Sequence, residues 1–259
     1  MRVAILSDIH GNSVAFDVVL ADVERQGGVD EYWLLGDLVA MGPDPVGVMQ
    51  RIQSLPTSHA IRGNTDRWLL DVHTELPFLR QETLADDQTK LPYLLELAYS
   101  MIWTQGALMA SGDLDWVANL PLEYRRILSN NTRVLCVHAA PGEDDGDGIR
   151  PTMSDEQLAT MIAETEADLI LVGHTHWALD RTIAGVRLVN LGSVSLPVLP
   201  DLRASYVLLE ANAEGYRIIP RQVDYDHQRV IEQLQAQKHP GSASISAFLA
   251  GKRKPFWEG

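Results

Sequence analysis

Residues 3–12 read VAILSDIHGN and join a short apolar run to two potential metal ligands. The run, residues 3–6, has the length and the branched side chains of a buried strand. Asp8 and His10 follow it almost at once, in a segment whose glycine and asparagine favour a tight turn before a helix. This stretch therefore predicts a strand that belongs to the fold and ends on a ligand-binding loop.

The same arrangement recurs four more times along the chain. Apolar runs typical of short buried strands occupy residues 32–35, 59–61, 134–137 and 169–172. The polar motifs that follow them are Gly36-Asp37, Gly63-Asn64, His138 and Gly173-His174-Thr175-His176. Amphipathic stretches at 14–26 and 46–54 separate the first three runs and predict helices. The N-terminal half therefore resembles repeated β-α-β units, which indicates a parallel sheet.

In a parallel sheet the loops at the carboxyl ends of the strands meet at one rim. We therefore expect seven donors to form one cluster: Asp8, His10, Asp37, Asn64, His138, His174 and His176. Two divalent cations a few ångströms apart need about seven or eight protein ligands and a shared bridging group. The sequence thus predicts a site for two transition metal ions. Carboxylate, amide and imidazole donors without thiolate suit manganese, iron, zinc, cobalt or nickel, and of these five we expect manganese.

The second half of the chain has closely spaced strand patterns with little helical sequence between them. These patterns occupy residues 178–184, 186–191, 205–210 and 216–221, with Ala184-Gly185 and Glu214-Gly215 as turns. They predict a second sheet, mixed or antiparallel, that stacks on the first with helices outside.

One domain is expected over residues 1–259, with a helical cap insertion at about 67–130 and a helical tail at about 225–259. Within these regions the pattern predicts helices at 66–72, 92–110, 112–119 and 225–237. Ser154 and Gln157 form a capping box for a further helix. Residues 74–90 are polar and predict a loop, for which closure over the rim as a lid is the functional interpretation.

Composition restricts the possible partners. The net charge is −14, with 35 acidic and 21 basic residues, which disfavours binding to a long nucleic acid. A small phosphorylated substrate remains compatible, because two dications reverse the local potential. No apolar run approaches the roughly 20 residues that span a bilayer, so no membrane association is expected. The single cysteine, Cys136, excludes a disulfide within the chain and is consistent with a cytoplasmic location.

These motifs together resemble the calcineurin-like metallophosphoesterases, in particular their small bacterial and archaeal phosphodiesterases. The matching segments are residues 7–12, 35–37, 62–66, 137–138, 173–176 and 191–194. The resemblance implies an α/β fold, a four-layer α/β/β/α sandwich with two stacked mixed sheets. It also implies that one metal is held by Asp8, His10 and His176, and the other by Asn64, His138 and His174. Asp37 would bridge the two.

The implied function is a phosphodiesterase that acts on a small, nucleotide-like substrate through a hydroxide between the two metals. A phosphomonoesterase or dinucleoside polyphosphate hydrolase is an alternative within the enzymes. A non-catalytic interaction module on the same fold is a third possible function, but the complete set of metal ligands disfavours it. The oligomeric state stays open.

Two residues are candidates for direct catalytic roles. Thr65 occupies the position where many relatives carry a histidine that protonates the leaving oxygen, and a hydroxyl is a poor general acid. This departure predicts a preference for phosphodiesters and activated esters. Asn12 could donate to a phosphate oxygen or cap the following helix, and the sequence favours neither.

For several other residues a structural role is a better interpretation than a functional one. Asp66 is expected to cap a helix, Arg62 to pair with a carboxylate and Trp177 to pack, although it could stack on a nucleobase. Cys136 is expected to be a small buried residue. The acidic loop 143–148 lacks the twelfth-position acid of an EF-hand and predicts a solvated loop that disfavours highly anionic substrates. The remaining histidines, expected to be structural or exposed, are His59, His73, His227 and His239.

Overall fold

The computed structural model describes residues 1–72, 91–198 and 200–252. The loop expected at 74–90 and its action as a lid lie outside these residues, as do His73 and the last part of the expected C-terminal tail. None of the helices within the described ranges is both long and apolar enough to cross a membrane.

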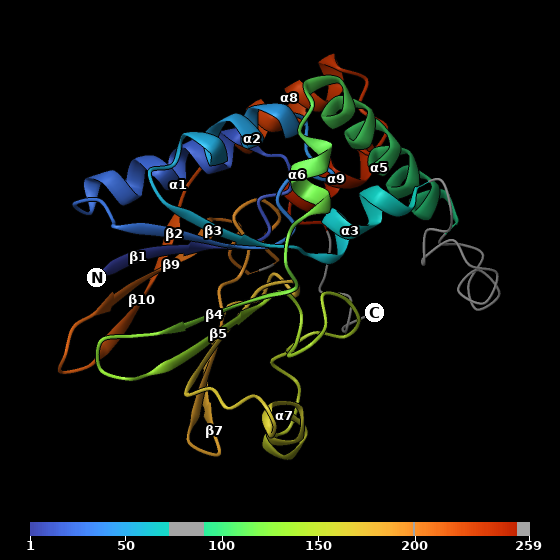
Figure 1. Cartoon of the computed structure of the whole chain (residues 1–259). Helices are drawn as coiled ribbons and strands as arrows, with labels where there is room; N and C mark the ends of the chain where they lie inside the picture. The colour runs from blue at the N-terminus through green and yellow to red at the C-terminus, as the bar shows by residue number, and fades with distance from the viewer. Residues whose placement is uncertain (73–90, 199, 253–259) are drawn as a thin grey trace.

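Two five-stranded mixed sheets form the centre of the described structure (Figure 1). The first sheet has the order β10-β9-β1-β2-β3 and the second has the order β4-β5-β6-β8-β7. The strands of the first are β1 (Arg2–Leu6), β2 (Glu31–Leu35), β3 (Ser58–Ile61), β9 (Ala204–Ala211) and β10 (Tyr216–Val223). Those of the second are β4 (Glu123–Ile127), β5 (Arg133–Val137), β6 (Leu169–Val172), β7 (Leu179–Ile183) and β8 (Val186–Asn190).

Each sheet contains three neighbouring parallel strands, which form one side of the first sheet and the middle of the second. β1 pairs in parallel with β2, and β2 with β3. In the second sheet β5, β6 and β8 are parallel neighbours. The antiparallel strands lie outside these: β9 and β10 beside β1, β4 beside β5, and β7 beside β8.

One expectation about the strands was wrong. The last four strand patterns do not form a sheet of their own, because β9 returns to pair with β1 and carries β10 with it, whereas β7 and β8 extend the second sheet. The sequence also gave no signal for β4, whose residues EYRRI carry three charges and are half-buried to exposed.

Helices cover the outer face of each sheet and complete four layers (Figure 1). The helical layer over the first sheet includes α1 (Ser13–Arg25), α2 (Pro45–Ser54), α3 (Asn64–Asp71), α5 (Leu91–Ser111), α6 (Leu114–Ala118), α8 (His227–Ala236) and α9 (Ser242–Leu249). The second sheet is covered by α7 (Asp155–Ile162). The insertion between β3 and β4 is helical, and α5 packs on α2 and α3 within the first helical layer.

Alternate side chains of each strand point to opposite faces of the sheet, so the strands contribute to two separate parts of the core. Val3 and Ile5 of β1 face the second sheet, where they share one apolar cluster with Cys136 and Leu171. The intervening residues of β1 face the helices. Each fully buried aliphatic side chain contributes about 1.5–3 kcal/mol, so both faces of the sheets stabilise the sandwich.

Side-chain caps set the start of several helices. Asn12 Oδ1 accepts a hydrogen bond from Ala15 N at the start of α1, and Asp44 caps α2 with Pro45 in its first turn. Ser154 and Gln157 form the predicted capping box of α7. These caps fix where each loop between strand and helix ends.

Candidate metal centre

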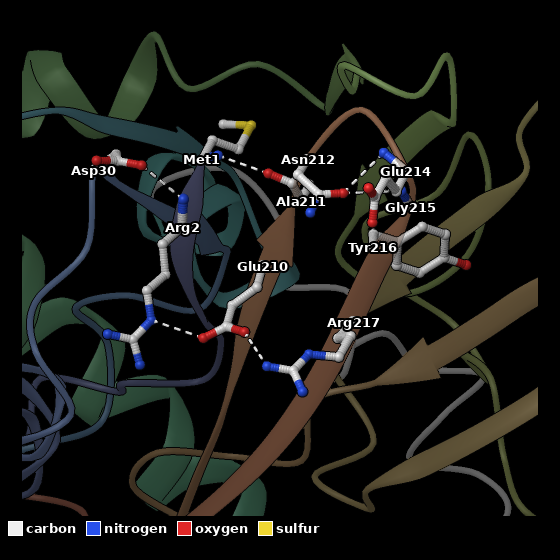
Figure 2. A pocket seen from close by; sticks show the side chains of 10 residues that line it. All are labelled: Met1, Arg2, Asp30, Glu210, Ala211, Asn212, Glu214, Gly215, Tyr216 and Arg217. Carbon is white, nitrogen blue, oxygen red and sulfur yellow. Dashed lines mark hydrogen bonds and ion pairs between the residues drawn. The ribbon is translucent and has the colours of Figure 1, made fainter.

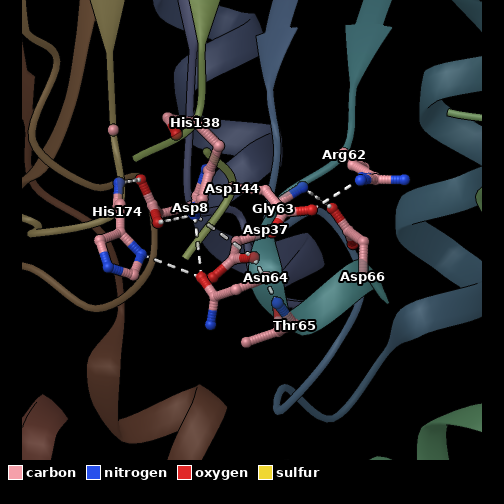
Figure 3. Close-up of polar contacts among 12 residues, drawn as sticks. Asp8, Asp37, Arg62, Gly63, Asn64, Thr65, Asp66, His138, Asp144 and His174 are labelled. Atoms are coloured by element: carbon pink, nitrogen blue, oxygen red, sulfur yellow. Dashed lines mark hydrogen bonds and ion pairs between the residues drawn. The ribbon is translucent and has the colours of Figure 1, made fainter. Parts of the chain in front are cut away.

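The loops after five strands meet at one rim of the sandwich, and hydrogen bonds between backbone groups join them. Asp8 N donates to Gly36 O at 3.1 Å, and His10 N donates to Asp37 O at 2.9 Å, which links the β1 loop to the β2 loop. Gly173 N donates to His138 O at 2.9 Å and links the β5 and β6 loops. The seven predicted donors therefore lie in one region, most of which Figure 3 shows.

Five of the seven donors have a left-handed backbone. The φ angles lie between 48° and 67° for Asp8, His10, Asp37, His174 and His176. Residues other than glycine adopt this conformation at a cost of about 1–3 kcal/mol each, and such residues cluster at functional sites. The rim therefore stores backbone strain at the residues that the sequence singles out.

Two glycines allow the loops to approach closely. Gly36 has φ 83°, and a Cβ atom there would lie 2.5 Å from Gly63 N and 2.7 Å from His138 Nδ1. At Gly63 an added Cβ would lie 2.1 Å from Asp37 Oδ1. Larger residues at either position would displace Asp37 or His138, which explains why glycine precedes the donors of β2 and β3.

One group of donors consists of Asp8, His10 and His176. His176 Nε2 lies 3.1 Å from Asp8 Oδ1 and 3.2 Å from His10 Nε2. His10 Nε2 lies 3.8 Å from Asp8 Oδ1. The three donor atoms are close enough to coordinate one ion together.

A second group lies beside the first. Asn64 Oδ1 is 2.9 Å from His174 Nδ1 and 3.2 Å from His138 Nε2. Asp37 faces both groups, since its Oδ1 is 3.5 Å from His138 Nε2 and its Oδ2 is 3.7 Å from His10 Nε2. A carboxylate in this position has one oxygen directed to each group.

Backbone carbonyls orient three of the four imidazoles. His138 Nδ1 donates to Leu35 O at 2.7 Å, His174 Nε2 donates to Gly146 O at 2.8 Å, and His176 Nδ1 donates to Leu196 O at 2.6 Å. Each bond fixes the ring and leaves the other nitrogen directed to the centre. Anchoring of this kind is typical of metal-binding histidines.

The electrostatics keep both carboxylates ionised. Burial acts to raise the pKa of Asp37, but the facing imidazoles of His138 and His10 outweigh it and hold the pKa well below its ordinary range. Burial acts to lower the pKa of His138, but Asp37 and Asp8 outweigh it and raise that pKa to about 10. For His10 burial dominates and lowers the pKa to about 4. The centre thus combines anionic oxygens with imidazoles whose pKa values differ widely.

The chemistry of the donor set fits divalent metal ions. Asp8 Oδ1 is buried and makes no hydrogen bond within the described ranges, although three imidazole nitrogens lie 3.1, 3.8 and 4.0 Å from it. A buried carboxylate oxygen without a hydrogen bond is unfavourable unless a cation meets it. Hard oxygens and imidazoles without a thiolate suit transition metal ions.

The structure shows what the two candidate catalytic residues contact. Asn12 has both polar side-chain atoms engaged, because Oδ1 caps α1 and Nδ2 donates to Ser195 Oγ at 3.1 Å. Thr65 N donates to Asp37 Oδ1 at 2.9 Å, and Thr65 Oγ1 is buried with no hydrogen bond among the described residues. Figure 3 shows Thr65 beside Asn64 and Asp37. The helix-cap alternative for Asn12 is confirmed, and direct catalytic roles for both residues stay predictions.

Asp66 and Arg62 have the structural contacts that were expected. Asp66 Oδ2 accepts from Gly63 N at 2.9 Å as a cap of α3, and its Oδ1 accepts from Leu38 N at 3.0 Å. Burial and the charge of Asp37 raise the pKa of Asp66 to about 7. Arg62 Nε donates to Asp144 Oδ2 at 2.7 Å.

The acidic loop differs from its expected solvated state at Asp144. This side chain is buried and accepts hydrogen bonds from Arg62 and from Arg67 Nε, the latter at 3.0 Å. Arg67 Nη2 also donates to Asp145 Oδ2 at 2.8 Å. The two arginines, of which the sequence singled out only Arg62, attach the loop to α3 and to the segment that precedes it. The same loop supplies the Gly146 carbonyl that orients His174.

The other singled-out residues lie away from the donors. Cys136 is fully buried between the sheets, as expected. His59 stacks on Tyr124, His227 Nδ1 donates to Leu249 O, and His239 packs edge-on against Trp103. These contacts are structural, which agrees with the sequence interpretation of the three histidines.

A cavity of about 650 Å³ lies at the opposite end of the first sheet (Figure 2). It is bordered by the start of β1 and the β9–β10 hairpin, and its charged groups pair with each other. Arg2 Nε lies 3.2 Å from Glu210 Oε1, and Arg217 Nη2 lies 2.6 Å from Glu210 Oε2. Cavity size therefore does not mark the chemical site in this molecule.

The fold and the rim define a phosphoester hydrolase. A family model for the calcineurin-like phosphoesterase superfamily domain matches residues 1–214. The chain belongs to that superfamily of metal-dependent phosphoesterases, as its sequence motifs predict.

Two similar proteins extend over nearly the whole chain. An uncharacterized protein of Methanocaldococcus jannaschii is 24% identical and covers 95% of this chain and 97% of its own. The crystal structure of a metallophosphoesterase from Sphaerobacter thermophilus has a TM-score of 0.73 at 25% identity, covering 98% of this chain and 99% of that one.

A third similarity is partial. The symmetrical bis(5'-nucleosyl)-tetraphosphatase of Pectobacterium atrosepticum is 34% identical over 98 residues, which are 38% of this chain. The chain spans about a third of that enzyme, 35% of its length.

Proposed function

We propose that the protein is a dinuclear metal-dependent phosphohydrolase whose preferred substrates are small phosphodiesters. The observation that carries this proposal is the position of Asp37, with one oxygen directed to His138 and the other to His10 at 3.5 and 3.7 Å. A carboxylate shared between two groups of donors is the arrangement that two neighbouring cations require.

The chain supplies all the ligands for such a centre. Asp8, His10 and His176 hold one ion, and Asn64, His138 and His174 hold the other. Asp37 is shared. Two divalent cations, manganese in our proposal, lower the pKa of a water molecule to near neutrality and polarise the phosphoryl group. The protein's own contribution is to fix the donors on a strained and buried rim.

Thr65 determines the class of ester in this proposal. Its backbone N–H holds the Asp37 carboxylate in place, and its buried hydroxyl cannot protonate a leaving alkoxide efficiently. Loss of general acid catalysis reduces rates by about 10²- to 10⁴-fold for basic leaving groups. Esters whose leaving group is stable as an anion are therefore favoured, and diesters of this kind fit best.

A dinucleoside polyphosphate hydrolase is the second candidate. The observation that favours it is the similarity of 98 residues to a symmetrical bis(5'-nucleosyl)-tetraphosphatase. A phosphate leaving group needs little protonation, so Thr65 is compatible with this substrate as well. The complete donor set disfavours a non-catalytic interaction module.

The test is a hydrolysis assay with protein whose bound metal has been removed by a chelator. Separate samples are then reloaded with manganese, iron, zinc, cobalt or nickel. Substrates are bis(p-nitrophenyl) phosphate, p-nitrophenyl phosphate and diadenosine tetraphosphate. We expect turnover to require metal and to be highest on the diester with manganese. Higher turnover of diadenosine tetraphosphate would instead select the second candidate.

Matched amide substitutions locate the activity. Asp37→Asn keeps the shape of the side chain but removes the shared carboxylate, and a loss of at least about 10³-fold is expected. Glu164→Gln makes the same change at an exposed carboxylate on the other side of the sandwich and should have no effect. Turnover that survives the chelator or the Asp37→Asn change would contradict the proposal.

A further inference from the structure

A cavity of about 150 Å³ adjoins the candidate metal centre at His176. His176 is one of the residues that line the cavity, and its Nε2 lies 3.1 Å from Asp8 Oδ1. Its Nδ1 donates to Leu196 O, and the next residue, Pro197, forms part of the cavity wall. The cavity and the candidate metal centre thus share His176 and are neighbours.

Apolar side chains form most of the wall. The apolar residues that line the cavity are Trp177, Ala178, Pro197, Val198 and Pro200. Such surfaces bind rings through burial and stacking rather than through charge. A dry apolar cavity of about 150 Å³ is known to hold a benzene molecule, so one aromatic ring fits the available space.

The floor of the cavity depends on a glycine. Gly192 has φ 77°, and a Cβ atom there would lie 2.9 Å from Ser205 Oγ and 3.0 Å from Ser205 Cβ. Ala178 Cβ would lie 3.5 Å from it. The absence of a side chain at residue 192 therefore lets Ser205 lie close to this part of the cavity wall.

The polar end of the cavity does not offer a free positive charge. Arg203 Nε donates to Asp201 Oδ1 at 3.0 Å, and Arg203 Nη2 donates to Gln222 Oε1 at 2.7 Å. The charge of Arg203 is offset by Asp201, which makes this end a poor site for a second phosphate. An uncharged ring with polar edge atoms matches the lining better.

We propose that this cavity binds an aromatic ring carried by the phosphoester, either a nucleobase or an aryl group. This inference rests on the proposed function, because the phosphate must first lie at the metal centre. It assigns Trp177 and Ala178 to substrate selection, and it predicts that esters without a ring bind more weakly.

Binding of phosphonates tests this inference without turnover, since their P–C bond is not hydrolysed. The probes are phenylphosphonate and methylphosphonate, titrated calorimetrically into manganese-loaded protein. We expect phenylphosphonate to bind at least about tenfold more tightly, which corresponds to about 1.4 kcal/mol. A nucleoside 5'-phosphonate is titrated in parallel. If it binds more tightly than phenylphosphonate, the cavity prefers a nucleobase; if phenylphosphonate binds more tightly, the cavity prefers an aryl ring.

Ala178→Leu fills the cavity and should remove the advantage of the ring while leaving the affinity for methylphosphonate unchanged. Ala213→Leu adds the same side chain at an exposed position in the β9–β10 turn and serves as the matched control. Trp177→Ala is a second variant that should reduce the advantage of the ring by removing one wall. Thermal melting of each variant establishes that it is folded.

The outcomes separate this inference from the proposed function. Equal affinities for the two phosphonates in the wild type, or an equal loss of both in Ala178→Leu, would overturn the inference while leaving the metal centre intact. Failure of methylphosphonate to bind in a metal-dependent manner would overturn the proposed function, and the inference with it.

Discussion

Asp37 combines a left-handed backbone with two oxygens that face different groups of donors. The residues around it hold this conformation. Thr65 N donates to its Oδ1, and Gly63 leaves the space that its side chain occupies. Strain of about 1–3 kcal/mol per residue is tolerated here because several independent contacts determine each position.

The sequence was sufficient to predict that these seven side chains lie at one rim, because each follows a strand that is short and recognisable. It was not sufficient to find Arg67 or the Gly146 carbonyl. Arg67 looks like any exposed helical arginine until the acidic loop folds back onto α3. A backbone carbonyl such as that of Gly146 has no sequence signature, since every residue carries one.

Substitution of Thr65 tests the role of leaving-group protonation. Thr65→His introduces a group that can act as a general acid, so the rate on an alkyl phosphoester should rise by about 10²-fold. The rate on a p-nitrophenyl ester should change much less, because that leaving group needs no proton. Parallel kinetics on the two esters measure the difference. Equal effects on both esters, or the absence of any gain, would rule out the assigned reason for the preference.

At the scale of elements, the loop after β5 is attached to α3 by the pairs of Asp144 with Arg62 and Arg67. The same loop supplies the carbonyl that orients His174. The position of one donor therefore depends on ion pairs that do not themselves reach the centre. Residues that orient metal-binding histidines typically change metal affinity by about 10- to 100-fold when lost.

Asp144→Ala should accordingly weaken manganese binding by about 10-fold or more while the overall fold persists. The readout is calorimetric titration of metal into chelator-treated protein, together with circular dichroism. Asp147→Ala is the matched control, because Asp147 lies on the same loop but is exposed and pairs only locally, with Arg150. If the two variants bind manganese equally well, the loop does not position His174.

His239 connects the C-terminal region to α5 through its contact with Trp103. Its Nδ1 accepts a hydrogen bond from Gly241 N at 3.1 Å, and burial lowers its pKa from 6.5 to about 4. Between these two pH values the unfolded chain binds a proton that the folded chain rejects. This contribution to stability is therefore complete above about pH 6.5 and is lost as the pH falls towards 4.

The predicted loss is roughly 2–3 kcal/mol between pH 7 and pH 4. Urea unfolding of the wild type and of His239→Phe at pH 7 and at pH 4 isolates the contribution of His239, since other titrating groups contribute equally to the two proteins. The variant should lose less stability than the wild type by this amount. Identical pH dependences would show that His239 does not contribute in this way.

The elements themselves were predicted more accurately than their partners. Helices α1, α2 and α5 begin and end within about one residue of their predicted bounds, because periodicity and caps are local signals. Which sheet a strand joins is decided by contacts distant in the sequence. The pairing of Arg2 with Glu210 in register is one such contact. Nothing near β9 in the sequence reveals that its neighbour is β1.

At the scale of the whole molecule, the two sheets converge so that strand ends from both supply the donors. This arrangement gathers two buried carboxylates and four imidazoles, of which two are buried and two half-buried. Grouping so many polar side chains is unfavourable unless they are satisfied by a ligand. The fold should therefore gain stability from the metal that its family requires.

Metal removal should lower the thermal midpoint of the protein. A free metal concentration of 100 times the dissociation constant adds about 2.7 kcal/mol to the free energy of unfolding. For a chain of this size, about 1 kcal/mol shifts the thermal midpoint by roughly 2–4 °C. Calorimetric scans with excess manganese and with excess chelator measure the shift. In Asp37→Asn the shift should be strongly reduced, whereas Glu164→Gln should retain it. A midpoint that does not respond to metal would argue against binding at this rim.

The most direct test of the central claim is anomalous scattering from a crystal of the manganese-loaded protein. The account predicts two peaks about 3.5–4 Å apart at the rim. One should be coordinated by Asp8, His10 and His176, the other by Asn64, His138 and His174, and Asp37 should contact both. A single peak, or peaks that do not contact Asp37, would contradict the account.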